Sequence, residues 1–352
     1  MTAAYRDSVR LAVIVVNYNT PAYAIAAVRS LLSERVHFPL LKVILVDNAS
    51  HDGSPDIMRE GLADLISDGF VTLLPLTLNG GFGWANNQAM LRLLAQPQPP
   101  EYIMLLNPDC EIIPGALHEL VDHIQKHPEY GVVGSQLLNV DGSKTGSAFR
   151  FHSVASEFAR GVRNATLARW LGIRPIFIES DVPVEVDWVT GASCLFNVEA
   201  LRTVGLFDDG FFLYFEEAEL MFRLKRGGWL AGYVPDSRVR HIGGASTGLK
   251  EGKSLIASSF PDYWYRSRRR YFTQTLGAGT AGMANIAWLL GDTLAYIVAW
   301  FLPARKDPSG GEDRRQMFSC GLRSSAEDKR PAIAHVGDPV DQPPHWMQEK
   351  SR

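Results

Sequence analysis

The sequence has few cysteines and no surplus of basic charge. Its 352 residues include 3 cysteines, 35 lysines and arginines, and 38 aspartates and glutamates, for a formal net charge of −3. Three cysteines without metal-ligand spacing exclude a disulfide framework and favour a reducing compartment. Because there is no basic excess, a dedicated nucleic-acid-binding protein is not expected, and no nucleic acid is predicted as a partner.

An apolar leader and an internal repeat are also missing. The first ten residues, MTAAYRDSVR, contain no apolar run, so no secretory signal peptide is expected. The hydrophobic share of 46 % and the charged share of 21 % are typical of a globular protein with a sizeable core. We therefore expect a cytoplasmic globular protein of one or two domains.

Strand-like and helix-like segments alternate through the first part of the chain. Continuous β-branched runs predict strands buried on both faces, and segments rich in helix formers separate them. The expected strands are 11–16, 42–47, 71–74 and 102–106, and the expected helices are 22–32, 57–65, 84–94 and 114–126. This alternation predicts an α/β fold with a mostly parallel, Rossmann-like sheet and helices on both faces.

The pattern becomes less regular beyond residue 131. Short strands are expected at 131–134, 186–189 and 194–197, and a helix at 216–226. We predict one domain over residues 1–275, with a nucleotide-binding half at about 1–130 and an acceptor half at about 131–275. A C-terminal helical extension at 276–303 and a polar tail at 304–352 follow. The proline-rich composition of the tail predicts that it is largely disordered.

The apolar segment at 277–303 carries a single charged side chain, Asp292, and follows a cluster of arginines. Its length is sufficient for a transmembrane helix. Asp292, Asn285 and several glycines favour equally a helix that lies in the membrane surface. A buried or oligomer-forming helical hairpin is the third interpretation.

Polar side chains follow three of the expected strands at the point where each strand ends. They are Asn17 and Asn19, Asp47, and the Asn107-Pro108-Asp109 turn. Ligands of parallel sheets bind outside the carboxyl ends of the strands, so these side chains are expected to line one crevice. A carboxylate such as Asp47 can accept hydrogen bonds from a nucleobase or a ribose, although Asp and Asn are also common turn residues.

The turn Asn79-Gly80-Gly81-Phe82-Gly83 precedes an expected helix that contains Asn86. Its backbone amides can approach a phosphate at the amino end of that helix. A tight turn without a ligand explains the same glycines, and their spacing does not match a dinucleotide-binding fingerprint.

Acidic side chains point to two further functions. Asp109 can bind a divalent cation, because Mg²⁺ uses one or two protein carboxylates together with phosphates, and His241 can complete such a site. Glu216, Glu217 and Glu219 follow an aromatic run, where a carboxylate can serve as general base. The same acidic residues also suit the amino end of a helix, and Asp109 and His241 have ordinary structural explanations.

Together and in this order, these motifs resemble family 2 glycosyltransferases of the nucleotide-diphosphosugar transferase (GT-A) fold, in particular their rhamnosyltransferase-like branch. The matching stretches are VIVVNYN (13–19), ILVDNASHDGS (44–54), LNGGFGWANNQAM (78–90), LLNPDCEI (105–112), VTGASCLFNVEALRTVGLFDDGFFLYFEEAELMFRLKRGGW (189–229) and VRHIGGAS (239–246).

The resemblance implies a role for each matching position. Asp109 and His241 would bind Mg²⁺ or Mn²⁺ at the donor diphosphate. Glu217 would be the general base, supported by Glu216 and Glu219. The acceptor and sugar pocket would include Trp188, Gly191 and Ala192. The donor-binding residues would be Asn17, Asn19, Asp47, Asn79, Gly80, Gly81, Asn86 and Asn107.

The implied activity is inverting, metal-dependent sugar transfer in bacterial cell-surface polysaccharide synthesis. The donor would be dTDP-rhamnose or a UDP-sugar, with rhamnose favoured, and the acceptor a hydroxyl of a saccharide or lipid-linked saccharide. The enzyme would be cytoplasmic and peripheral at the inner face of the plasma membrane.

Two positions depart from the family pattern. Asn107 stands where many members have Asp, and the usual Glu-Asp-x-Asp is Glu216-Glu217-Ala218-Glu219. The longer acidic side chains keep open a catalytically impaired nucleotide-sugar-binding subunit. A sugar nucleotidyltransferase is the other alternative, although no basic triphosphate loop lies near the first strand.

Overall fold

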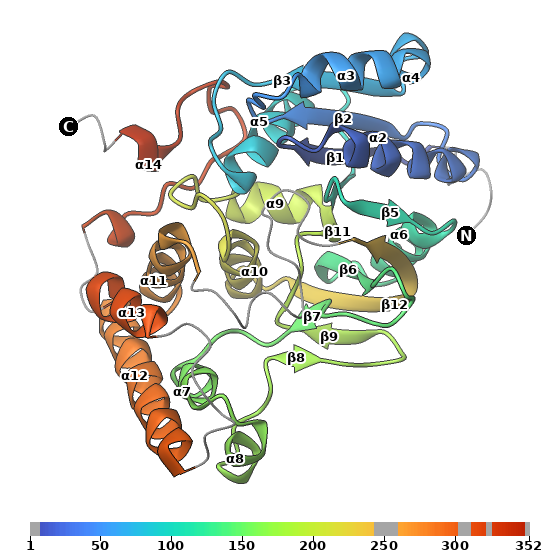
Figure 1. Cartoon of the computed structure of the whole chain (residues 1–352). Helices are drawn as coiled ribbons and strands as arrows, with labels where there is room; N and C mark the ends of the chain where they lie inside the picture. The colour runs from blue at the N-terminus through green and yellow to red at the C-terminus, as the bar shows by residue number, and fades with distance from the viewer. Residues whose placement is uncertain (1–7, 243–259, 302–310, 322–325, 349–352) are drawn as a thin grey trace.

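A nine-stranded sheet forms the centre of the protein (Figure 1). The computed structural model describes residues 8–242, 260–301, 311–321 and 326–348. The order of the strands is β3-β2-β1-β4-β11-β6-β12-β5, and β9 pairs with β12. The strands of this sheet are β1 Leu11–Asn17, β2 Lys42–Asp47, β3 Val71–Pro75, β4 Tyr102–Leu106, β5 Cys110–Ile112, β6 Tyr130–Leu138, β9 Val184–Val186, β11 Ser193–Asn197 and β12 Leu230–His241.

The first half of the sheet is parallel. Strand β1 pairs in parallel with β2 and β4, and β2 pairs in parallel with β3. Their carboxyl ends therefore lie at one edge, as the alternating sequence pattern predicts. In the second half, β11 is antiparallel to β4 and β6, whereas β12 is parallel to β6 and antiparallel to β5 and β9.

Helices cover both faces of the sheet, which confirms the predicted α/β class. Residues 11, 13 and 15 of β1 pack into a core with α2, α3 and α6, and residues 12, 14 and 16 pack into a second core with α5, α9 and α10. The helices that form these two cores are α2 Pro21–Ser30, α3 Ser54–Gly61, α5 Phe82–Leu94, α6 Ala116–Lys126, α9 Val198–Val204 and α10 Glu216–Arg226, with the short α4 Ala63–Ser67 and the 3-10 helix η1 Leu31–Val36 beside them.

The strand expected at 186–189 is divided between two sheets. Strand β9 ends at Val186, and β10 (Trp188–Val189) belongs to a three-stranded sheet with β7 (Ala148–Phe149) and β8 (Phe177–Ile178). Asp187 separates them, because its carboxylate accepts hydrogen bonds from the Phe151 amide at 3.0 Å and from Lys225 at 2.6 Å.

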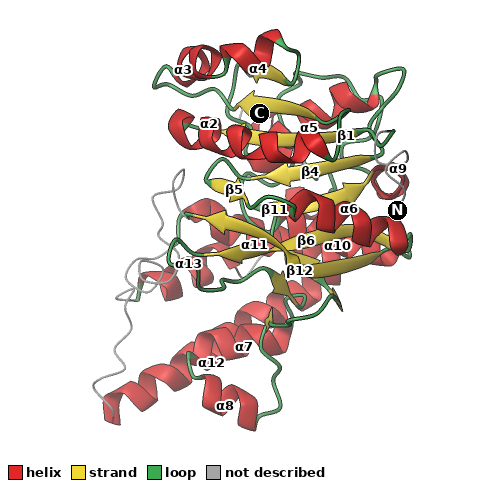
Figure 2. Ribbon diagram, turned by 90° about the vertical axis from the view of Figure 1, so that its right-hand side faces the viewer, coloured by secondary structure: helices red, strands yellow, loops and turns green. Residues whose placement is uncertain are grey.

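The apolar segment forms the helix α12 (Ala278–Phe301), which extends beyond the sheet with α7 (Val154–Val162) and α8 (Ala165–Trp170) (Figure 2). It is the one helix of the described residues with the length and composition to cross a membrane, and 33 % of that stretch is buried. A Cβ on Gly161 would lie 2.3 Å from the Trp288 carbonyl oxygen, so α7 and α12 are in close contact. Asp292 is buried and pairs with Arg163 at 2.8 Å and with Arg314 at 2.7 Å.

The prediction of a largely disordered tail is wrong for its described residues. Helix α11 (Asp262–Leu276) precedes α12, and the tail contains α13 (Glu312–Gly321), the 3-10 helix η3 (Glu327–Lys329) and α14 (His345–Gln348). The Leu206 amide donates to the Ala334 carbonyl at 2.8 Å, and Trp84 Nε1 donates to the Gln342 carbonyl at 2.9 Å. The average composition predicts disorder because most residues of the tail are polar. A few widely spaced residues nevertheless bind the tail to the rest of the protein, and an average over the segment does not reveal them.

Candidate active site

The ends of β1 and β2 are joined by a hydrogen-bonded network. Asn17 Nδ2 donates to Asp47 Oδ1 at 2.8 Å, and Ser50 donates to the same carboxylate through its amide at 2.9 Å and its hydroxyl at 2.7 Å. Asn19 has a φ of 57°, and its amide donates to Ser50 Oγ at 2.9 Å. The structure thus brings three predicted donor-binding residues together, with Asp47, only 1 % exposed, at the centre.

The glycine turn before α5 is held by side chains of the neighbouring strand end. Asn48 Nδ2 donates to Asn79 Oδ1 at 2.8 Å, the Gly80 amide donates to Asn48 Oδ1 at 3.3 Å, and the Gly81 amide donates to Asn79 Oδ1 at 3.1 Å. Both glycine amides therefore have protein acceptors, as expected for a tight turn. Asn79 organises the turn beside the Asp47 network.

Gly81 and Phe82 join this turn to the loop before α10. Gly81 has φ 93° and ψ 176°, a conformation that is almost restricted to glycine, and an added Cβ would lie 2.0 Å from the Phe212 carbonyl oxygen. That oxygen accepts the Phe82 amide at 3.1 Å. One turn later, Asn86 Nδ2 donates to the Phe82 carbonyl at 2.9 Å, and its buried Oδ1 has no hydrogen-bond partner among the described residues.

Asp109 and His241 meet through strand pairing. Strand β5 is antiparallel to β12, with Cys110 opposite His241. His241 Nε2 lies 3.4 Å from Asp109 Oδ1, and both side chains are buried. Ligand atoms of Asp109, Cys110 and His241 lie within 4.8 Å of one another.

An imidazole and a carboxylate are donors that suit Mn²⁺ or Mg²⁺ together with phosphate oxygens. Cys110 would favour a softer metal, but its side chain is part of the hydrophobic core. The carboxylate and imidazole pair of Asp109 and His241 therefore fits the predicted cation. The Asn107 amide donates to the Ala192 carbonyl at 2.9 Å, which links the turn at residues 107–109 to the acceptor pocket predicted from sequence.

Three carboxylates lie at the amino end of α10, and they differ in their environment. Glu219 accepts hydrogen bonds from Arg223 Nε at 2.8 and 3.0 Å and is therefore part of a structural ion pair. Glu216 and Glu217 each have a buried Oε2 without a hydrogen-bond partner among the described residues.

The backbone before these carboxylates is strained. Tyr214 and Phe215 have φ values of 71° and 70°, which bulky side chains rarely adopt. Such strain is typical of functional sites, where the surrounding structure imposes it. Here the two residues turn the chain abruptly into α10, so that Glu216 and Glu217 are its first residues.

Burial raises the pKa of both Glu216 and Glu217. For Glu216 the negative charge of Glu217 raises the pKa further, well above its ordinary value. For Glu217, hydrogen bonds from its own amide and from the Gly191 amide oppose the effect of burial. The two backbone amides therefore favour the ionised form of Glu217, whereas the charge of Glu217 disfavours ionisation of Glu216.

The residues of the predicted acceptor pocket make different contacts. A Cβ on Gly191 would lie 3.3 Å from the Phe82 ring and 3.8 Å from Glu217 Cβ. Gly191 therefore lies between Phe82, at the start of α5, and Glu217. Ala192 contacts Asn107 as described above. The ring of Trp188 stacks on Phe149 with centroids 4.1 Å apart, and its Nε1 donates to the Arg150 carbonyl at 3.0 Å.

Sequence reasoning missed the contribution of the C-terminal tail. Trp346 Nε1 donates to the Gly80 carbonyl at 3.1 Å, and its ring centroid lies 5.2 Å from that of Phe212. The only signal was the isolated tryptophan itself, in a segment whose average composition is that of a disordered tail.

Comparison with known proteins agrees with this arrangement. Residues 12–180 match the family described as Glycosyl transferase family 2, and residues 102–304 match Glycosyl transferase family group 2. An N-acetylglucosaminyl-diphospho-decaprenol L-rhamnosyltransferase of Mycobacterium tuberculosis is 30 % identical over 241 residues, which are 65 % of this chain and 75 % of the relative. The chain belongs to glycosyltransferase family 2. It is a glycosyltransferase enzyme, similar to the rhamnosyltransferases of that family.

A more distant relative and two solved structures complete the comparison. A low-salt glycan biosynthesis hexosyltransferase of Haloferax volcanii is 24 % identical over 149 residues, or 42 % of this chain and 44 % of that protein. A mannosyltransferase of Pyrobaculum calidifontis, solved with GDP-Man and Mn²⁺, has a TM-score of 0.54 and 16 % identity, and covers 89 % of this chain and 86 % of its own. S. aureus TarS with UDP-GlcNAc has a TM-score of 0.52 and 15 % identity, over 88 % and 79 %. At these identities the likeness establishes the GT-A fold of this glycosyltransferase.

Proposed function

We propose that this glycosyltransferase transfers a sugar, with rhamnose favoured, from a nucleotide-diphosphate sugar to a lipid-linked saccharide, with inversion at the anomeric carbon. The 30 % identical relative supports this substrate class, because its name specifies rhamnose and an N-acetylglucosaminyl-diphospho-decaprenol acceptor. The observation that carries the chemical part of the proposal is Glu217. Its side chain is half-buried, with a buried Oε2 that has no hydrogen-bond partner among the described residues, and it lies next to Gly191 and close to the Phe82 ring.

Glu217 acts as the general base in this mechanism. It removes the proton of the acceptor hydroxyl while that oxygen attacks the anomeric carbon. The bond between this carbon and the diphosphate breaks, and its electron pair leaves with the nucleoside diphosphate. A single displacement inverts the anomeric configuration, since retention by double displacement would require a covalent nucleophile.

Asp109 and His241 would hold a divalent cation beside the donor diphosphate. Such a cation stabilises negative charge that develops on the leaving diphosphate. Asn17, Asn19 and Asp47 bind the nucleotide in this proposal, because their network lies at the carboxyl edge of the parallel strands. The cation in this proposal is Mn²⁺ or Mg²⁺.

The test is a panel of dTDP-rhamnose and UDP-sugars with Mn²⁺ or Mg²⁺ and a soluble analogue of an N-acetylglucosaminyl-diphospho-lipid. Product linkage determined by NMR reports inversion or retention. A nucleotidyltransferase would instead release pyrophosphate from a nucleoside triphosphate and a sugar phosphate. A catalytically impaired subunit would bind the donor without transfer or hydrolysis, and either result would overturn the proposal.

We further propose that the enzyme is cytoplasmic and docks on the inner face of the plasma membrane through α8 and α12. Among the described side chains of α12, the exposed ones are all uncharged, and Met283, Ile286, Leu290 and Ile297 follow one helical face. At the tip of α8, Trp170 is 82 % exposed, beside the exposed Arg169. Apolar and aromatic side chains next to arginine suit the headgroup region of an anionic bilayer.

Co-sedimentation with phosphatidylglycerol vesicles tests this docking. Leu290→Glu and Trp170→Glu are expected to reduce the bound fraction. Val36→Glu is the matched control, because Val36 is an equally exposed apolar residue, at 82 %, on a different helix. Equal binding of all three variants and the wild type would contradict docking through this surface.

A further inference from the structure

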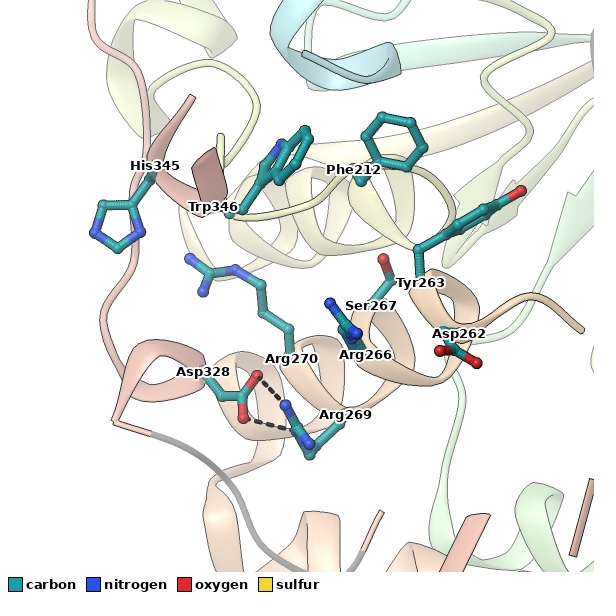
Figure 3. A pocket seen from close by; sticks show the side chains of 11 residues that line it. Phe212, Asp262, Tyr263, Arg266, Ser267, Arg269, Arg270, Asp328, His345 and Trp346 are labelled. Atoms are coloured by element: carbon teal, nitrogen blue, oxygen red, sulfur yellow. Dashed lines mark hydrogen bonds and ion pairs between the residues drawn. The ribbon is translucent and has the colours of Figure 1, made fainter. Parts of the chain in front are cut away.

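A cavity of about 440 Å³ lies between α11, the loop before α10 and the C-terminal tail (Figure 3). Tyr263 and Arg266 of α11, Phe212 of the loop and Trp346 of the tail contribute to its lining. Tyr263 and Arg266 take no part in the donor and metal sites described above, whereas Phe212 and Trp346 contact the glycine turn before α5. The volume of the cavity is within the range of small-molecule binding sites.

One wall of the cavity is aromatic. The ring centroid of Phe212 lies 5.2 Å from those of both Tyr263 and Trp346, and Tyr214 stacks on Tyr263 at 6.1 Å with an interplanar angle of 14°. All four side chains are partly exposed, so apolar ring surface remains accessible to a ligand. Such a wall suits the flat apolar face of a sugar ring.

Arg266 is the arginine of the lining that has no ion-pair partner among the described residues. Arg269 pairs with Asp328 at 2.7 Å, and Arg270 pairs with Asp208 at 2.7 Å. Arg266 is exposed and forms no hydrogen bond or ion pair with any residue of the described ranges. Its guanidinium can therefore bind a phosphate through two parallel hydrogen bonds.

The carboxylates of the lining leave room for an anion. Its charged side chains other than His345 are three arginines and two aspartates, Asp262 and Asp328. Asp328 is bound by Arg269, and Arg270 is bound by Asp208 outside the lining. Asp262 is exposed at the start of α11, so Arg266 is the lining arginine that remains for an anion.

The cavity adjoins the glycine turn before α5. Two of its lining residues contact that turn, because Trp346 donates to the Gly80 carbonyl and the Phe212 carbonyl accepts the Phe82 amide. The same loop leads from Phe212 to Glu217 five residues later, so their Cα atoms are at most about 18 Å apart. An acceptor that extends from the cavity along this loop would bring a hydroxyl toward the carboxylate.

We propose that this cavity binds the acceptor at the junction of its saccharide and its diphosphate. Arg266 pairs with an acceptor phosphate, and the aromatic wall of Tyr263, Phe212 and Trp346 packs against the sugar. This inference rests on the function proposed above. The donor also carries a diphosphate, so the experiment must separate the two sources of phosphate.

Calorimetric binding to the full chain separates them. The probes are N-acetylglucosamine 1-diphosphate with a short alkyl chain, the alkyl N-acetylglucosaminide without phosphate, and the nucleotide-sugar donor with Mn²⁺. We expect Arg266→Ala to weaken binding of the diphosphate probe at least about tenfold, because a charged hydrogen-bonded pair is lost. The affinities for the other two probes should remain unchanged. Arg226→Ala is the control, since Arg226 is also exposed at a helix and unpaired among the described residues.

Unchanged affinity for the diphosphate probe in Arg266→Ala would overturn the inference. An equal loss of donor affinity would assign the cavity to the donor diphosphate instead. Binding is measured without turnover, so these results do not depend on whether the wild type transfers sugar. The transfer assay described above tests the proposed function separately.

A second variant tests the aromatic wall. Tyr263→Ala is expected to weaken both acceptor probes by a similar factor, because the sugar contact is common to them. Tyr263→Phe keeps the ring and should retain wild-type affinity. If Tyr263→Ala lost affinity for the diphosphate probe alone, the proposed contact between Tyr263 and the sugar would be contradicted.

Discussion

Replacing Glu217 or Glu216 by glutamine tests which carboxylate takes the proton from the acceptor. Each substitution keeps the size of the side chain and removes its ability to ionise. Burial and the charge of Glu217 raise the pKa of Glu216 well above its ordinary value, whereas two backbone amides oppose the effect of burial on the pKa of Glu217. With Glu217 as the base, Glu216→Gln should change transfer little, because glutamine resembles a protonated glutamate, whereas Glu217→Gln removes the base.

General-base catalysis contributes about 10²–10⁴-fold to a rate, and the loss in kcat for Glu217→Gln should fall in this range or above it. Donor affinity should remain, because neither carboxylate belongs to the Asp47 network or to the Asp109–His241 pair. For Glu216→Gln we expect kcat within about tenfold of the wild type, equivalent to less than about 1.4 kcal/mol of activation free energy.

The pH dependence provides a second measure. Burial raises the pKa of Glu217, and the base must be ionised, so kcat/KM of the wild type should fall as pH decreases through a value above the ordinary glutamate pKa. Glu216→Gln should retain this acidic limb, and the residual activity of Glu217→Gln should lose it.

The assay measures nucleoside diphosphate release over a range of pH, with calorimetric donor affinity in parallel. An inactive Glu216→Gln together with an active Glu217→Gln would refute the assignment and exchange the two roles. Near-wild-type turnover in both variants would refute a base in this pair.

Three further predictions concern the proposed metal site, the glycine turn before α5 and the buried ion pair between Glu157 and Arg268. Asp109→Ala should remove the Mn²⁺-dependent part of donor affinity in calorimetry, and unchanged affinity would contradict its metal role. Gly81→Ala should lower the free energy of unfolding, measured by urea titration, by more than the about 1–3 kcal/mol expected for backbone strain, because the added Cβ would also clash with Phe212. Gly142→Ala is the control: Gly142 has a φ of 82° and open space around it, so this variant should show the cost of strain alone. Glu157→Ala should cost about 3–5 kcal/mol, because Arg268, 2.6 Å away and buried, loses its partner. Burial, the largest influence, raises the pKa of Glu157, but Arg160 and Arg268 together lower it to about 2, so the wild type should lose this stabilisation as pH falls from about 4.5 toward 2.

The parallel half of the sheet could be predicted because its signal is local. Runs such as 11–16 and 43–46 consist of apolar, mainly β-branched residues, and polar side chains of the proposed donor site follow at their ends. The network of Asn17 and Asp47 follows from their parallel pairing, in which these residues are directly opposite.

Strand β12 could not be predicted in the same way. It contains Gly232, Pro235 and Asp236, which are turn residues in most sequences. The structure accommodates them with a register shift between Val234 and Arg238. The same strand positions His241 beside Asp109, so the proposed metal site depends on a pairing between segments about 130 residues apart, for which the sequence provides only the family resemblance.

The described residues of the last quarter of the chain pack against the domain that contains the central sheet, and Asp208 shows how. This fully buried carboxylate accepts hydrogen bonds from Arg270 at 2.7 Å and from the Ala332 amide at 3.2 Å. It therefore joins the loop before α10 to both α11 and the tail. Since the same loop holds Gly81 through Phe212, and the tail holds Gly80 through Trp346, the donor turn is fixed from two sides by segments outside the parallel half of the sheet.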